Sequence, residues 1–237
     1  MDTTFEHLQK IVNSNINRLH EQGYIVLKNL VISERLLARL AAKYGDIVNV
    51  GNGPYSKVSG KVFRLSNEDE ILKNRDLTNF GNLWHHDYSI SNKKGKYTFL
   101  YAVKVPPEKG RTFFMNMNLN EMMQSYLENY GIYNPYDCKV IHDSGSVRLV
   151  DNLVVTHPVN KKDYIYLGSE NYSKVDDGGN IYSSSLIFNH LSEKINVYKH
   201  LWEEGDLIIW DNRIVSHKAE GFDSHRFKRI MLRCAVT

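Results

Sequence analysis

Turn-forming residues recur at short intervals along most of this chain. Clusters rich in Gly, Pro, Asn, Asp, Ser and Lys separate short apolar segments, at Gly51–Gly60, Ser91–Lys96, Pro106–Gly110, Asn160–Lys162 and Asp176–Asn180. We predict strands between and beside these clusters, at 98–105, 149–156, 163–168, 206–210 and 229–236. Many short strands separated by turn signals predict an antiparallel barrel or jelly roll.

Helical patterns flank and interrupt the strands. Apolar residues in 4–21 are spaced as in an amphipathic helix, with Thr3 or Thr4 as its cap and Gly23 as its end. A buried strand at 24–27 follows. Further helices are predicted at 34–43, opened by Ser33, and at 119–129 and 186–199. The expected fold class is therefore mainly β with flanking helices (α+β), the helices packing outside the barrel.

Length and composition limit the classes of protein. The chain has 237 residues, of which 42% are hydrophobic, enough for one domain spanning 1–237 with a core of its own. The 30 Lys and Arg nearly balance the 27 Asp and Glu, so nothing demands nucleic acid or an anionic membrane as partner. No apolar run reaches the ~18 residues of a membrane span.

The two cysteines, Cys138 and Cys234, form no CxxC pair. Their number and spacing exclude a disulfide scaffold and a thiolate zinc site, and fit a reducing compartment. Because the first ten residues are polar and show no signal peptide, we expect a cytoplasmic protein.

The first candidate site is the segment Trp84–Tyr88, with the sequence WHHDY. If this segment is a strand, His85 and Asp87 project to one side and His86 to the other. The first two side chains could then bind a metal from adjacent coordination positions, and His86 would not be a ligand. The alternative is a surface strand with two polar residues.

The second candidate site ends at His217. A turn at Gly205 leads into an apolar strand, a polar turn at 211–213 and then this histidine. His217 could supply a third ligand, and two histidines with one carboxylate form the facial triad of non-haem Fe(II) oxygenases. The alternative is a surface histidine after an ordinary turn.

The third candidate site is a pair of arginines in the last strand. Arg229 and Arg233 are four residues apart and share a face with Met231 and Ala235, whereas the alternate face is wholly apolar and predicted to be core. If the arginine face lines a barrel interior, both charges need anionic partners, because unpaired buried charge is costly. A dicarboxylate co-substrate would supply them. The alternative is a strand whose arginines reach solvent.

Together these segments resemble the taurine dioxygenase family of Fe(II)/2-oxoglutarate-dependent oxygenases. Matching blocks occur in the family's order over most of residues 20–236: GYIVLKNL (23–30), WHHD (84–87), VPPEKGRT (105–112), VVTHPV (154–159) followed by YIYLG, and GDLIIWDNRIVSH (205–217) followed by RIMLR (229–233). The segment YKHLWEEGDLIIWDNR (198–213) is also similar to carbapenem synthase-like members.

The resemblance implies a double-stranded β-helix, which is a jelly-roll barrel. It implies Fe(II) held by His85, Asp87 and His217, with 2-oxoglutarate and O2 as co-substrates. Arg229 aligns with the arginine that binds the distal carboxylate of 2-oxoglutarate, and Thr112 with its hydroxyl partner. Arg233 aligns with a second arginine near the C1 end of 2-oxoglutarate, which in some members also holds an anionic group of the substrate.

The implied function is a dioxygenase that oxidises, most simply hydroxylates, a small molecule such as an amino acid or related small acid, with secondary metabolism as one setting. The intact Asp87 argues against halogenation. Alternatives are a desaturase or cyclase of a natural-product intermediate, a non-catalytic 2-oxoglutarate sensor, and a zinc hydrolase. The oligomeric state stays open, although a homodimer is the commonest assembly among soluble oligomers.

Substrate residues are harder to assign from the sequence. Tyr88 is large and follows the metal-binding carboxylate, so it would shape the substrate side of the pocket. Asn82 and Asn116 are further candidates, with ordinary packing as the alternative for all three. We predict lids at 51–82 and 169–185, because both segments are turn-rich and flank the metal-binding blocks.

Overall fold

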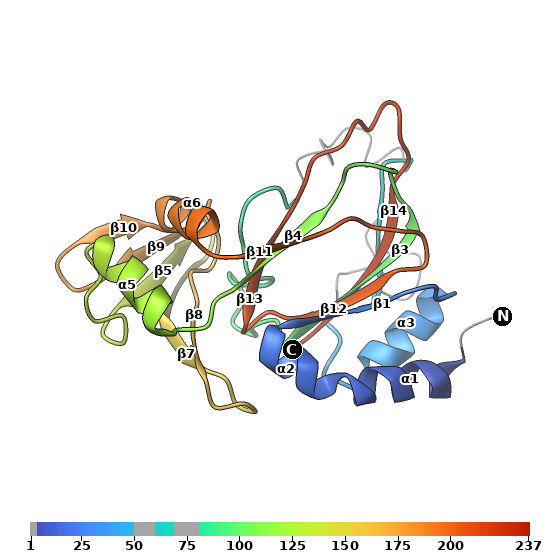
Figure 1. Cartoon of the computed structure of the whole chain (residues 1–237), viewed down its shortest axis with the longest axis horizontal. Coiled ribbons are helices and arrows are strands. Elements are labelled where there is room, and N and C mark those ends of the chain that lie inside the picture. Colours follow the sequence, from blue (N-terminus) through green and yellow to red (C-terminus); the bar gives the residue numbers. More distant parts are fainter. Residues whose placement is uncertain (1–3, 50–59, 69–80) are drawn as a thin grey trace.

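The computed structural model describes residues 4–49, 60–68 and 81–237. Its main body holds two antiparallel sheets that face each other (Figure 1). The five-stranded sheet has the order β1 (Tyr24–Leu27), β12 (Leu207–Asp211), β3 (Tyr97–Lys104), β14 (Ile230–Val236), β2 (Phe63–Ser66). The three-stranded sheet has the order β11 (Val197–His200), β4 (Thr112–Asn116), β13 (Val215–Ala219). This pair of sheets is the predicted jelly-roll barrel.

Strand β3 is buried on both faces over residues 97–102, because the N-terminal helices cover one face of its sheet and the three-stranded sheet covers the other. Tyr97, Phe99 and Tyr101 pack outward beneath the N-terminal helices, whereas Leu100 and Ala102 face the interior of the barrel. Alternation along the strand therefore places apolar side chains in two separate cores. The last strand behaves as predicted, since its apolar face joins the outer core.

The N-terminal helices α1 (Phe5–Ser14), α2 (Ile16–Gln22) and α3 (Glu34–Ala41) cover the outer face of this sheet (Figure 1). Thr4 caps α1, and Gly23 ends α2 with φ of +89°. The single helix predicted over 4–21 is wrong in its middle, because the chain breaks at Asn15. The Asn15 amide donates to the carbonyl of Ile11, a local bond that competes with the helical ladder.

A second lobe is inserted between β4 and β11 (Figure 1). It contains the helices α5 (Glu121–Asn129) and α6 (Ser184–Lys194) and the strands β5 (Lys139–Asp143), β6 (Arg148–Asn152), β7 (Val154–Thr156), β8 (Asp163–Ile165), β9 (Ser173–Asp176) and β10 (Ile181–Ser183). The four strands in the order β10-β9-β5-β6 form one sheet, and β7 pairs with β8. Both helices contribute to a separate apolar core in this lobe.

Two predicted boundaries in this lobe are wrong. The segment expected to be one strand at 149–156 is two strands in different sheets, separated at the buried Leu153. Both halves are extended, so the sequence reads as one strand, and only their different pairing partners separate them. The helix expected at 186–199 ends at Lys194, and the residues from Val197 onward form β11 against β4. Tertiary pairing thus overrides a helical spacing of apolar residues. No helix in the described ranges is both long and apolar enough to cross a membrane.

Candidate active site

The segment that carries WHHD lies between β13 and the turn that precedes β9. His85 exchanges two backbone hydrogen bonds of 3.0 Å with His217, and the His86 N–H donates to the Gly168 carbonyl at 2.9 Å. Within this segment only His85 forms β-bridges, and the chain turns at Asp87. The segment is therefore not the regular strand, with side chains on alternate faces, that the sequence predicted. The backbone pairing nevertheless brings His85 and His217 side by side.

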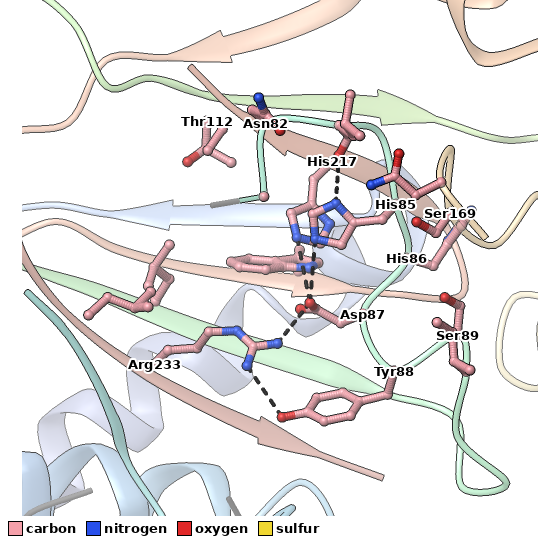
Figure 2. Close-up of a pocket in the computed structure, with 18 of the residues that line it drawn as sticks. Asn82, His85, His86, Asp87, Tyr88, Ser89, Thr112, Ser169, His217 and Arg233 are labelled. Carbon is pink, nitrogen blue, oxygen red and sulfur yellow. Dashed lines mark hydrogen bonds and ion pairs between the residues drawn. The ribbon is translucent and has the colours of Figure 1, made fainter. Parts of the chain in front are cut away.

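Three side chains converge at this point (Figure 2). The Nε2 atoms of His85 and His217 each lie 3.8 Å from Oδ1 of Asp87, and all three donor atoms lie within 4.8 Å of one another. These separations are too long for hydrogen bonds, so the three groups do not satisfy one another. They are suitably placed to share a cation.

The imidazole of His85 has a defined tautomer. Its Nδ1 lies 2.7 Å from the carbonyl oxygen of Leu83, which can only accept, so in the neutral ring Nδ1 carries the proton and Nε2 the lone pair. The ring of His217 packs against Trp210 in a tilted arrangement, with 4.7 Å between centroids, and its buried Nδ1 has no hydrogen-bond partner within the described ranges. Packing, not a hydrogen bond, therefore holds the second ring.

Charge at the cluster suits a divalent cation. Burial lowers the pKa of His217 well below its ordinary value, and the nearby His85 lowers it further, so the imidazole is neutral. Burial alone would raise the pKa of Asp87, but the charge of the nearby Arg233 outweighs this effect and holds the carboxyl ionised. Two imidazoles and one carboxylate are the donor set that non-haem Fe(II) sites use.

The cluster opens into a pocket of about 680 Å³. All three donors, Thr112, Arg229 and Arg233 line it, as do Asn82 and Tyr88. Asn116 is not among the lining residues, so the structure does not support a substrate contact for it. The reason is its position at the far end of β4, four residues beyond Thr112, where its amide donates to the Gln22 carbonyl at 3.2 Å.

Arg229 has no salt-bridge partner in the part of the chain that the structure describes. Its guanidinium is half-buried, its Nε atom makes no hydrogen bond, and burial lowers its pKa to about 10. Thr112, in β4 of the other sheet, lines the same pocket and accepts a hydrogen bond of 3.0 Å from the indole N–H of Trp202. An indole can only donate, so the hydroxyl hydrogen of Thr112 is available to an acceptor in the pocket. The pocket therefore offers a positive charge and a hydroxyl donor to an anion.

Arg233 is placed differently from Arg229. Its Nη2 lies 2.8 Å from Oδ1 of Asp87, and its Nη1 donates to the hydroxyl of Tyr88 at 3.3 Å (Figure 2). Tyr88 has φ of +58°, which is uncommon for a residue other than glycine. The positive φ and the bond to Arg233 fix the ring at the pocket wall.

Two other histidines in the matching sequence blocks, His86 and His157, have structural contacts. His86 is buried and donates from Nδ1 to the Asn212 carbonyl at 2.8 Å, so it is turned away from the three donors. His157 is fully buried and bonds to Asp211 at 3.1 Å. Sequence reasoning missed Thr98 and Asn212, which contact Asp87 from behind. Their only signal is that each is a polar residue in or beside an apolar strand.

The predicted lids are only partly described. Residues 50–59 and 69–80 lie outside the described ranges, so most of the lid predicted at 51–82 cannot be placed. The lid predicted at 169–185 contains β9 and β10, and its first turn contributes Ser169, Asn171 and Tyr172 to the pocket lining. The lid role of either segment stays a prediction.

A family model described as "Taurine catabolism dioxygenase TauD, TfdA family" matches residues 3–235. The chain belongs to this family. The TauD, TfdA assignment agrees with the resemblance that the sequence blocks indicate and with the jelly-roll fold.

Curated relatives of this TauD, TfdA family chain include two alpha-ketoglutarate-dependent 2,4-dichlorophenoxyacetate dioxygenases. The one from Burkholderia sp. (strain RASC) is 25% identical over 201 residues, which are 76% of this chain and 64% of the relative. The one from Cupriavidus pinatubonensis is 28% identical over 204 residues, which are 76% and 66%. The chain thus spans just under two thirds of the length of these relatives.

Solved structures show the same fold. A putative alpha-ketoglutarate-dependent taurine dioxygenase from Burkholderia xenovorans superposes with a TM-score of 0.74 at 18% identity, covering 96% of this chain and 83% of that one. The structure of AAD-2 in complex with Mn(II) and N-oxalylglycine superposes with a TM-score of 0.73 at 24% identity, covering 100% and 90%. These matches extend over the barrel and the inserted lobe.

Proposed function

We propose that this chain is an Fe(II)- and 2-oxoglutarate-dependent dioxygenase that hydroxylates a small organic acid. The observation that carries the proposal is the meeting, in one pocket, of a His-Asp-His cluster and an arginine, Arg229, that has no salt-bridge partner among the described residues. A metal alone would not need the arginine, and an anion site alone would not need the cluster. A dicarboxylate that also binds a metal uses both.

His85, Asp87 and His217 are proposed to hold the metal. The donor set fits Fe(II), because the lone pair of His85 Nε2 and the ionised carboxylate face a common point. Bound Fe(II) supplies the redox chemistry that couples O2 and 2-oxoglutarate to oxidation of a C–H bond, with succinate and CO2 as co-products. The protein's own contribution is to fix the donors and to limit access of water.

Arg229 and Thr112 are proposed to bind the distal carboxylate of 2-oxoglutarate. The guanidinium can donate two parallel hydrogen bonds to a carboxylate, and Thr112 can add a third because Trp202 occupies only its acceptor side. Binding would also remove the cost of leaving Arg229 half-buried without a counter-charge. The co-substrate is thereby oriented with its other end toward the metal cluster.

The substrate is proposed to be a small acid, such as an amino acid or related compound. Several relatives carry names of organic acids, among them the 2,4-dichlorophenoxyacetate dioxygenases and an alpha-ketoglutarate-dependent sulfonate dioxygenase from Saccharomyces cerevisiae. Arg233, which is paired with Asp87, brings a second positive group to the pocket with the Tyr88 hydroxyl beside it, and Asn82 lines the pocket nearer Thr112 (Figure 2). This pattern favours an anionic substrate with further hydrogen-bonding atoms.

The test measures succinate formed by protein reconstituted anaerobically with Fe(II) and 2-oxoglutarate and then exposed to O2, with a panel of amino acids and other small acids. We expect one class of acid to stimulate succinate formation and to gain one oxygen atom. His85→Ala should abolish both signals, whereas the exposed His225→Ala should leave them unchanged.

Other outcomes distinguish the alternatives. A product that has lost two hydrogens would indicate a desaturase or cyclase. Metal and 2-oxoglutarate binding without any succinate, in the presence of the full panel, would support a sensor. Hydrolytic activity that survives replacement of Fe(II) by Zn(II) would contradict the proposed oxygenase.

A further inference from the structure

The carboxylate of Asp87 has a second contact that the metal cluster does not explain. Its Oδ2 accepts a hydrogen bond of 2.6 Å from the hydroxyl of Thr98, a fully buried residue of β3. The Thr98 oxygen in turn accepts from the side-chain amide of Asn212 at 3.0 Å. Thr98 thus contacts Oδ2, whereas the two histidines lie 3.8 Å from the other carboxylate oxygen, Oδ1. Oδ2 is therefore engaged by the barrel wall while Oδ1 faces the pocket.

Trp210 fixes the donor and acceptor roles along this series of hydrogen bonds. Its indole N–H can only donate, and it lies 2.9 Å from Oδ1 of Asn212. The backbone N–H of Asp87 donates to the same oxygen at 3.3 Å. The other end of the Asn212 amide must then be the NH2 group, which donates to Thr98. With its acceptor side occupied, the Thr98 hydroxyl can only donate to Asp87.

Strand pairing holds the residues of this hydrogen-bond network in place. Thr98 and Trp210 are directly opposite each other in the pairing of β3 with β12, and the Asn212 backbone N–H donates to the Lys96 carbonyl at 2.9 Å. Gly95 allows the close approach, because a Cβ there would lie 2.9 Å from the Asp87 carbonyl oxygen. The side chains thus come from two neighbouring strands and cannot shift independently.

We propose that Thr98, oriented by Asn212, is a positioning residue that presents Asp87 to the metal through Oδ1 alone. The inference rests on the proposed function and deepens it. A carboxylate that binds through one oxygen fills one coordination position, so the two histidines and Asp87 leave three positions for 2-oxoglutarate and O2. A carboxylate free to rotate could bind through both oxygens and fill one of those positions.

The test compares Mn(II) binding to metal-free wild-type protein, Thr98→Val and Thr98→Ser by titration calorimetry, with no 2-oxoglutarate present. Valine keeps the shape and the strand preference of threonine but cannot donate. We expect Thr98→Val to bind Mn(II) about 10–100-fold more weakly, the usual effect of removing an outer-shell partner. Thr98→Ser should restore affinity, and the electron paramagnetic resonance spectrum of bound Mn(II) should change only in the valine variant.

The matched control is Thr156→Val. Thr156 also donates to an aspartate, Asp163, at 2.6 Å, but it is exposed and lies in β7, away from the cluster. This control should lose no Mn(II) affinity. If Thr98→Val does not fold, as judged by circular dichroism, Thr98→Ala provides the same loss of the donor.

Folded Thr98→Val, or Thr98→Ala in its place, that binds Mn(II) with wild-type affinity and an unchanged spectrum would overturn the positioning role. Equal weakening by Thr98→Val and Thr98→Ser would overturn it as well, because serine keeps the donor. Failure of the wild-type protein to bind Mn(II) would instead contradict the proposed metal site itself, so the two failures are distinguishable.

Discussion

Arg233 lies 2.8 Å from the oxygen of Asp87 that faces the two histidines. The positive charge holds the pKa of the buried Asp87 well below its usual range, against the effect of burial, and so keeps the carboxylate ionised. Arg233 is therefore the counter-charge of Asp87 within the protein itself. A metal bound to the same oxygen would provide a second one.

Replacement of Arg233 by methionine should destabilise the metal-free protein strongly. Removing one partner of a buried ion pair leaves an uncompensated charge and costs about 3–5 kcal/mol. Mn(II) should restore a large part of this loss, because the cation compensates the same carboxylate. Urea unfolding with and without Mn(II) measures both effects. Equal losses in the two conditions would show that metal and arginine do not share Asp87. The exposed Arg226→Met is the control.

Replacement of Arg229 by methionine should have opposite effects on stability and on binding. Because the guanidinium has no counter-charge among the described residues, its removal should raise the free energy of unfolding of the metal-free protein by about 1 kcal/mol. The same change should weaken 2-oxoglutarate binding to the Mn(II)-loaded protein about 10–100-fold, the loss of charge-assisted hydrogen bonds worth about 1.5–3 kcal/mol. Thermal melting and calorimetry check the two parts. Undiminished 2-oxoglutarate affinity would contradict the assignment of Arg229.

Thr112→Val should weaken 2-oxoglutarate binding less than the arginine variant does. The hydroxyl supplies one neutral donor, worth about 1 kcal/mol, which corresponds to about a fivefold loss of affinity. Calorimetry on the Mn(II)-loaded protein measures it, with Thr156→Val as the control. A loss as large as that of Arg229→Met would indicate that the strand, and not one hydrogen bond, had been disturbed.

Acid should destabilise the protein partly through His86. Burial lowers the pKa of His86 from 6.5 to about 4, so below pH 6.5 the unfolded chain binds a proton that the folded protein does not. The stabilising effect of neutral His86 is complete above pH 6.5 and is lost as the pH falls toward 4, by about 3 kcal/mol at most. His86→Asn keeps a donor for the Asn212 carbonyl and removes the titration. Urea unfolding from pH 7 to 4 should show a shallower loss in this variant, and an identical pH dependence would contradict the account.

Much of the barrel and the cluster could be predicted from the sequence because the signals are local. Apolar segments bounded by turns predicted β1, β3, β12 and β14, and the WHHD and GDLIIWDNRIVSH blocks located the three residues that the backbone then brings together. The boundaries within 149–156 and 186–199 could not be predicted, because β-pairing with distant strands decides them. The same holds for Thr98 and Asn212, whose contact with Asp87 depends on the pairing of β3 with β12.

Asn116 shows the limit of reasoning from neighbouring residues. It shares a face of β4 with Thr112, so a pocket contact was a reasonable expectation. Asn116 lies at the other end of the strand from Thr112, outside the pocket, where its amide donates to the carbonyl of Gln22 at the end of α2. The sequence does not show how far along β4 the pocket extends. Arg233 shows the converse, since its position on the arginine face was predictable but its bond to Tyr88 was not.

The most direct test of the account is a crystal structure of the protein with Mn(II) and N-oxalylglycine, a dicarboxylate of the same length as 2-oxoglutarate. We expect Mn(II) bound by Nε2 of His85, Nε2 of His217 and one oxygen of Asp87, with the distal carboxylate of the ligand on Arg229 and Thr112. Mn(II) bound elsewhere, or a ligand carboxylate that avoids Arg229, would contradict the central claim.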